Sequence, residues 1–170
     1  KSIDGIEQPG GSGQSLELNE NNLRMVRRGM YSVSNDRRGT GYRSRIIADG
    51  LRMAGKSGTS QVRNITAAER AAGVIRNEDL PWERRDHALY VCFAPYEQPK
   101  YAVAVVVEHG GGGSKAAAPI ARDVMLQALY EGTPPLSAYP KGDRSRIKAQ
   151  QDRLERERLK QQQSQGSDKA

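Results

Sequence analysis

Apolar residues recur at helical spacing near the beginning of the chain. Four of them lie three or four positions apart and so share one face of a helix: Leu23, Val26, Met30 and Val33. Asn19, of a residue type that caps helix N-termini, precedes this pattern. Turn-forming residues at positions 35–41 end it. We therefore expect a helix over residues 18–34.

The middle of the chain carries three segments with the character of β-strands. Residues 88–95 and 101–108 are apolar and rich in β-branched or aromatic side chains, which favours buried strands. Their short connector predicts an antiparallel hairpin. Residues 52–63 alternate small and polar side chains, and the glycines at 55 and 58 permit another backbone to approach closely. This segment is the third expected strand.

A second helix is expected over residues 115–131. Its predicted apolar stripe consists of Ile120, Val124, Leu126 or Gln127, and Leu129. Pro119 fits the first turn of such a helix, and Gly132 with the following prolines stops it. The preceding glycine run, residues 110–113, predicts a mobile strand-to-helix turn. An alternative is a phosphate cradle at the helix N-terminus.

Composition divides the chain into a domain and two polar ends. Of 170 residues, 36% are hydrophobic, which is lean for one compact domain. The last thirty residues carry nine Lys or Arg and five Asp or Glu. We expect a linker or loop over residues 1–15, a folded domain over 16–133, and a charged tail, helical or disordered, over 134–170.

Charge and rare residues exclude several functional classes. The net charge is +7, of which the tail supplies +4, and no aromatic nucleic-acid-binding pattern is present. We therefore expect no nucleic-acid partner. One cysteine, Cys92, and two histidines, His87 and His109, argue against a disulfide framework and a metal site. The sequence predicts no metal and no cofactor. It favours a core thiol for Cys92 and a turn position for His109.

One candidate for phosphate chemistry lies between Gly50 and Ser57. These residues fit the pattern G-x-x-x-x-G-K-[ST] of a nucleotide-binding loop, and Glu108 ends an apolar strand as a magnesium ligand would. Such a loop must open a helix, but the residues after Ser57 are poor helix formers. A nucleotide hydrolase therefore remains an alternative that the context disfavours.

Read as a strand, the same segment suggests a different chemistry. In Lys56-Ser57-Gly58-Thr59, which we call the motif, Lys56 and Gly58 share one face and Ser57 and Thr59 the other. At a twisted sheet edge, these groups can still border a common cleft. A cation and two hydroxyls suit a substrate that docks as an added strand and ends in a carboxylate. Gly58 allows close approach, and an adjacent N–H can serve as an oxyanion donor.

K-[ST]-G is also the third signature of the penicillin-binding protein and serine β-lactamase superfamily. Five segments together resemble the C-terminal part of a class B penicillin-binding protein, of the penicillin-binding protein 2 type, over residues 15–131: residues 28–33, 38–41, 54–62, 86–96 and 105–113. The resemblance implies a partial α+β transpeptidase domain in which helices cover an antiparallel sheet.

The resemblance also implies an activity and roles for the motif. The family's D,D-transpeptidases cross-link peptidoglycan stem peptides ending in D-Ala-D-Ala during cell elongation, and β-lactams acylate the same serine. Lys56 resembles the catalytic lysine that relays protons, and Ser57, Gly58 and Thr59 resemble the substrate-binding residues. The Thr59 N–H resembles an oxyanion donor. A RodA-like glycosyltransferase partner and the periplasmic face of the bacterial inner membrane follow from the resemblance.

The chain departs from the family in its nucleophile. The family has S-x-x-K and S-x-N upstream of the lysine, whereas S-x-N is absent here and the only S-x-x-K is Ser145 to Lys148 in the tail. We interpret that match as chance. We therefore expect a fragment of a longer enzyme that is inactive alone. A non-catalytic scaffold, using the sheet edge and the basic tail, is the alternative.

Overall fold

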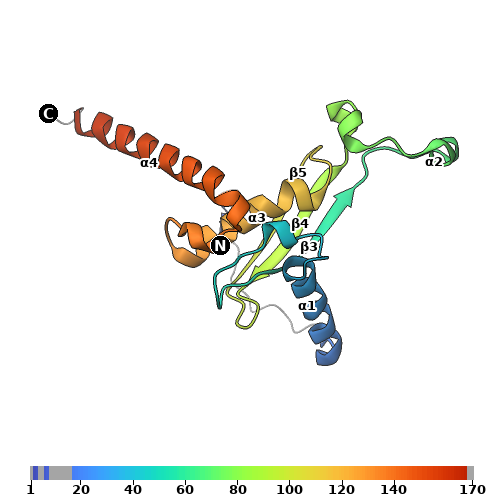
Figure 1. Ribbon diagram of the computed structural model, residues 1–170, viewed down its shortest axis with the longest axis horizontal. Helices are drawn as coiled ribbons and strands as arrows, with labels where there is room; N and C mark the ends of the chain where they lie inside the picture. Colours follow the sequence, from blue (N-terminus) through green and yellow to red (C-terminus); the bar gives the residue numbers. More distant parts are fainter. Residues whose placement is uncertain (1, 4–5, 8–16, 168–170) are drawn as a thin grey trace.

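The computed structural model describes residues 2–3, 6–7 and 17–167. Its centre is an antiparallel sheet of three strands in the order β3-β4-β5: β3 is Ala54–Ser60, β4 is His87–Ala94 and β5 is Tyr101–Val107. Figure 1 shows the three strands side by side with α3 lying across them. All three expected strands are present, and β3 is shorter than the expected 52–63.

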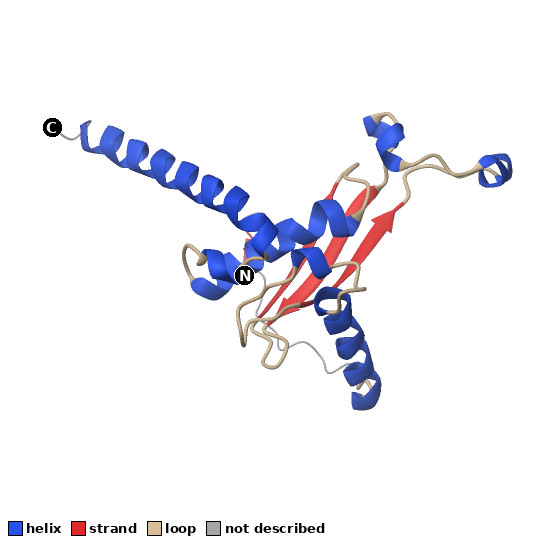
Figure 2. Cartoon of the chain, viewed as in Figure 1, coloured by secondary structure: helices blue, strands red, loops and turns tan. Residues whose placement is uncertain are grey.

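Helices surround this sheet unevenly. The α-helices are α1 (Glu20–Asn35), α2 (Ala67–Ala72), α3 (Gly113–Tyr130) and α4 (Arg144–Ser167). Short 3-10 turns occur at Tyr42–Ser44, Asn77–Asp79, Trp82–Arg84, Leu136–Ala138 and Lys141–Asp143. Figure 2 separates these helices from the sheet and the loops. None of the described helices is long and apolar enough to cross a membrane.

The core lies between α3 and one face of the sheet. The strand β4 turns alternate residues toward it: Ala88, Tyr90, Cys92 and Ala94. The helix α3 buries mostly small or flexible side chains against them: Ala117, Ala118, Ala121, Met125 and Leu126. The predicted stripe was wrong for Ile120 and Val124, which are 45% and 49% exposed. Alanines let the helix approach the sheet closely, so the larger β-branched residues face outward.

The helix α1 packs on the domain mainly through its C-terminal half. Asn19 caps it as predicted, because its side chain accepts hydrogen bonds from the backbone N–H groups of residues 21 and 22. At the other end, the Ser34 hydroxyl lies 2.9 Å from the Tyr90 hydroxyl. The expected core positions Leu23 and Val26 are 41% and 59% exposed. That half of α1 extends beyond the sheet (Figure 1), so their burial was predicted wrongly.

The helix α3 begins two residues before the expected position. A Cβ built on Gly113 would lie 2.1 Å from the Leu89 carbonyl oxygen and 2.5 Å from that of Gly58. The expected mobile turn therefore ends in a residue packed directly on β3 and β4. Since the helix begins earlier, Pro119 lies in its interior rather than in its first turn.

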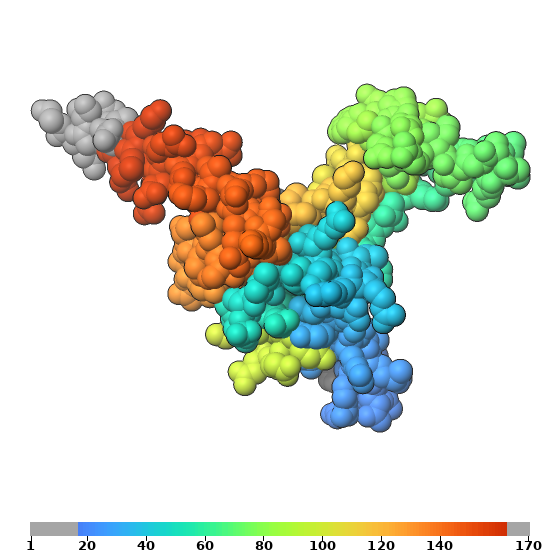
Figure 3. Space-filling model, viewed as in Figure 1, coloured from blue at the N-terminus to red at the C-terminus, as the bar shows by residue number. Residues whose placement is uncertain are grey.

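The charged tail forms α4, and its base belongs to the core. Ala138, Tyr139 and Ile147 are at most 3% exposed, so the core extends past the expected boundary at residue 133. The guanidinium of the buried Arg122 pairs with Asp143 just before the helix. The rest of α4 projects from the body (Figure 3). The expected linker 1–15 lies almost wholly outside the described residues, apart from the paired strands β1 (Ser2–Ile3) and β2 (Ile6–Glu7).

Candidate active-site strand

The motif occupies the centre of β3, an edge strand of the sheet. Register pairs Lys56 with Val91 and Thr59 with Ala88 along one side of the strand. On its other side, no strand within the described part of the chain pairs with β3. That side offers backbone donors and acceptors to an extended peptide, which is how a substrate adds a strand to a sheet.

The alternation predicted for the motif is present. Lys56 and Gly58 lie on the sheet face that carries Val91 and Leu89, whereas Ser57 and Thr59 share the face of Tyr90 and Ala88, toward α3. Exposure differs along the strand. Lys56 and Thr59 are exposed, whereas Ser57 and Gly58 between them are half-buried. The cation and the last hydroxyl are therefore accessible to a ligand from solvent.

The Lys56 ammonium is held beside the motif backbone. Its Nζ donates a hydrogen bond of 2.7 Å to the Ser57 carbonyl oxygen. None of the ion pairs between described residues involves Lys56. The positive charge is thus close to the exposed edge of β3 and is not neutralised by a neighbouring carboxylate. An anionic ligand at this edge would meet an available cation.

A second hydroxyl lies beside Ser57 that no sequence pattern predicted. The Thr40 Oγ1 is 3.2 Å from the Ser57 Oγ, and it comes from the turn between α1 and the first 3-10 segment. Residues 38–41 contributed to the family resemblance, but 17 positions separate the two hydroxyls. No periodicity rule connects residues so far apart, and only the fold brings them together.

Two other reactive residues are not part of this strand's chemistry. Burial raises the pKa of the Cys92 thiol to about 12, which keeps it protonated and poorly nucleophilic. Ser145 is exposed in the first turn of α4, and Lys148 three residues later pairs with Asp152 at 3.0 Å. The Cys92 thiol is therefore a poor nucleophile. Lys148 is paired with a carboxylate, so the S-x-x-K match in the tail does not have the features of an activated serine.

The two phosphate-binding alternatives do not have the required geometry. Lys56 and Ser57 lie inside β3, which continues to Ser60, whereas a nucleotide-binding loop needs a helix to begin there. At the second candidate, Gly113 is pressed against the backbone of Leu89 and Gly58. The turn position predicted for His109 is confirmed. This residue lies in the turn after β5, with its ring centroid 4.5 Å from that of Trp82.

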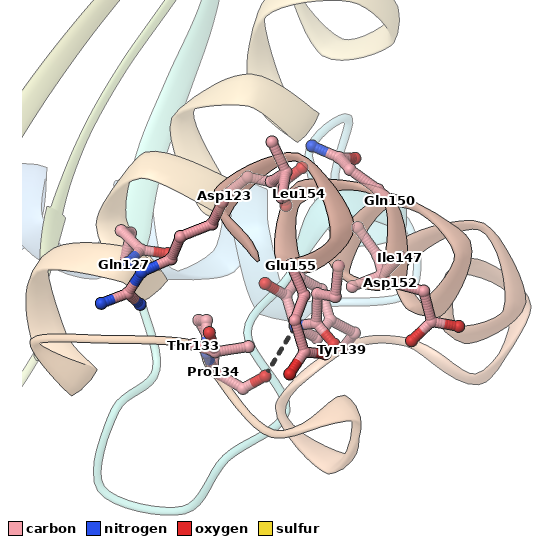
Figure 4. A pocket seen from close by; sticks show the side chains of 12 residues that line it. Asp123, Gln127, Thr133, Pro134, Tyr139, Ile147, Gln150, Asp152, Leu154 and Glu155 are labelled. Atoms are coloured by element: carbon pink, nitrogen blue, oxygen red, sulfur yellow. Dashed lines mark hydrogen bonds between the residues drawn. The ribbon is translucent and has the colours of Figure 1, made fainter. Parts of the chain in front are cut away.

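The motif does not line the pocket at the base of α4. Figure 4 shows that pocket, of about 520 Å³, between the end of α3, residues 133–139 and the base of α4. Tyr139, Ile147 and Leu154 supply much of its apolar lining. The edge of β3 is instead an open surface, which can form only one wall of a cleft.

Comparison with known proteins identifies the family of this chain. Residues 6–126 match the model of the penicillin binding protein transpeptidase domain. The chain belongs to this family, and its relatives are class B enzymes of the penicillin-binding protein 2 type. It is 42% identical over 114 residues to a peptidoglycan D,D-transpeptidase MrdA of Haemophilus influenzae, covering 67% of this chain and 17% of the relative. The MrdA of Salmonella typhimurium is 39% identical over 101 residues.

A solved structure gives the same assignment. A complex of penicillin-binding protein 2 with MreC from Helicobacter pylori matches with a TM-score of 0.51 and 37% identity, covering 67% of this chain and 18% of that chain. The family resemblance and the partial α+β transpeptidase fold are therefore confirmed. The chain spans about a sixth of its relatives' length, and the roles of the motif residues remain predictions. All of α4 lies beyond the family match.

Proposed function

We propose that this chain forms the motif-bearing wall of a peptidoglycan D,D-transpeptidase. The observation that carries the proposal is the position of Lys56-Ser57-Gly58-Thr59 in an edge strand whose outer side is open to an added strand. A stem peptide ending in D-Ala-D-Ala fits this edge, because it is extended and ends in a carboxylate.

In this proposal, each motif residue has a separate task. The serine of an S-x-x-K segment, supplied by the remainder of the domain, attacks the carbonyl of the penultimate D-Ala. The terminal D-Ala leaves with a proton, and the acyl group then passes to the amine of a neighbouring stem. Lys56 supplies positive potential and assists the proton transfers. The backbone N–H of Thr59 donates to the oxyanion.

Substrate binding falls to the remaining groups of the motif. The hydroxyls of Ser57 and Thr59 donate hydrogen bonds to the terminal carboxylate, and Gly58 lets the substrate backbone approach. A β-lactam carries a carboxylate in the corresponding place and acylates the same serine. The reaction needs no metal and no cofactor.

The family relationship supports a cellular setting. We assign the activity to cell elongation at the periplasmic face of the inner membrane, with a RodA-like glycosyltransferase as partner. Since the Helicobacter pylori relative was solved with MreC, a protein of that kind is a second candidate partner. A scaffold without catalysis remains the alternative for the chain alone, because its only S-x-x-K match is exposed on α4.

Labelling with a fluorescent penicillin tests the proposal. The sample is a chimera that joins the Haemophilus influenzae relative, up to the start of the 114-residue match, to this chain. We expect the chimera to carry covalent label on a denaturing gel and this chain alone to carry none. A folded chimera without label would contradict the proposal, and label on the chain alone would restore Ser145 as a candidate nucleophile.

A further inference from the structure

The turn that follows α1 is fixed by its own hydrogen bonds. The Gly39 N–H donates to the Asp36 carbonyl, and the Gly41 N–H donates to the Val33 carbonyl, both at 2.9 Å. The Asp36 side chain also accepts from the Arg38 N–H at 2.9 Å. These bonds join both sides of Thr40 to the end of α1. The turn is therefore a rigid support for that residue.

Close packing on both sides of Thr40 restricts the turn further. A Cβ on Gly39 would lie 2.2 Å from the Val33 carbonyl oxygen, and one on Gly41 would lie 2.7 Å from the Tyr90 hydroxyl. The Tyr90 hydroxyl is itself bonded to Ser34, so the wall behind Gly41 is rigid as well. Thr40 lies between these two glycines, and its side chain contacts β3 at Ser57.

Thr40 thus presents a hydroxyl at a defined place beside the motif. Its side chain is exposed, yet its Oγ1 is 3.2 Å from the Ser57 Oγ. A β-branched residue has few accessible rotamers, which limits the directions in which this hydroxyl can point. A serine on an edge strand has more freedom, so the contact orders Ser57 more than it orders Thr40.

We propose that Thr40 is a positioning residue that directs the Ser57 hydroxyl at the substrate's carboxylate. This inference rests on the proposed function. When Thr40 donates to the Ser57 Oγ, the hydroxyl hydrogen of Ser57 is left free to donate to the carboxylate. A chain of hydroxyls that ends on an anion strengthens each of its hydrogen bonds. Thr40 therefore raises affinity for a carboxylate without touching it.

The test compares two β-lactams on one protein. Benzylpenicillin has the carboxylate, and its methyl ester lacks the negative charge. In the chimera described above, we expect Thr40→Val to lower the acid-to-ester ratio of acylation rate constants about 5-fold, the effect of one hydrogen bond. We expect Thr40→Ser, which keeps the hydroxyl, to hold the ratio within about 2-fold of the parent. Because both rates come from the same sample, the folded fraction cancels.

The outcomes separate this inference from the proposed function. A parent chimera that is never acylated contradicts the proposed function, and the positioning role with it. A parent that is acylated, but whose ratio is the same with valine at position 40, overturns the positioning role alone. An equal loss for acid and ester in Thr40→Val also overturns it, because a purely structural disturbance affects both β-lactams alike.

Discussion

At the scale of single residues, burial decides the chemistry of Cys92. The thiol is 3% exposed on β4, and its pKa rises from 9.0 to about 12 because burial penalises the thiolate. A folded-state pKa above that of the unfolded chain favours the neutral thiol. The contribution of this neutral thiol to the free energy of unfolding is therefore fully present below pH 9 and is lost as the pH rises from there toward 12.

This burial predicts an unreactive cysteine. At pH 8 we expect iodoacetamide to modify Cys92 in the folded chain at least about 1,000-fold more slowly than in urea, since three pH units separate the two pKa values. Mass spectrometry of timed samples measures both rates. Equal rates in the folded and unfolded chain would show that β4 is not buried as described.

At this scale, the sequence predicts the features that depend on local geometry and near neighbours. The alternation of Lys56 and Ser57 follows from strand geometry, and the burial of Cys92 follows from its apolar neighbours. The contact of Thr40 with Ser57 and that of Ser34 with Tyr90 span 17 and 56 positions. Such contacts depend on how elements are placed in space, which no local pattern encodes.

At the scale of elements, the approach of α3 to the sheet depends on one glycine. Gly113 has no room for a Cβ, whereas Gly112 has nothing within 4 Å of its Cβ position and a negative φ of −98°. Since these two glycines are adjacent, alanine at each of them compares a loss of close packing with a loss of backbone freedom alone.

This difference predicts unequal effects of alanine. We expect Gly113→Ala to lower the free energy of unfolding by about 1–3 kcal/mol, because the new methyl group must displace α3 from β4. Gly112→Ala serves as the control; because Gly112 is the N-cap of α3, where alanine is less favourable than glycine, it is expected to cost at most about 1 kcal/mol. Urea unfolding followed by circular dichroism measures both. Equal effects would contradict the described contact with Leu89.

For α1 and α3, the sequence predicted the helix but not which of its residues are buried. Periodicity located both α1 and α3, because apolar spacing and capping residues are local signals. The predicted burial of Ile120 was wrong, because the periodicity rule selects large apolar residues for the buried face. Close packing on a sheet instead selected Ala117 and Ala121.

At the scale of the whole molecule, α4 is an anchored base with a projecting end. Ile147 is 3% exposed and joins the core, while Leu159 on the same helix is 51% exposed. Gln151 also donates to the Pro134 carbonyl at 2.9 Å, which ties the base to the preceding loop. Composition predicted a charged tail, helical or disordered, over residues 134–170, because a local pattern does not show which partners its few apolar residues contact.

This arrangement predicts that one side chain of α4 matters to the domain. We expect Ile147→Ala to cost about 2–4 kcal/mol of stability, as burial of a large aliphatic residue implies. The matched change Leu159→Ala is expected to cost less than about 0.5 kcal/mol. Thermal unfolding of the two variants measures the difference, and similar melting temperatures would mean that the base of α4 does not pack on the core.

If the motif of β3 acts on substrate, acylation depends on Lys56. The measurement is the second-order rate constant for acylation of the chimera by benzylpenicillin. We expect Lys56→Ala to lower it at least about 100-fold, because proton transfer and positive potential are both lost. Lys100→Ala, an exposed lysine just before β5, is expected to leave it unchanged. Unaltered acylation in the folded Lys56→Ala chimera would show that the motif of β3 does not act on substrate.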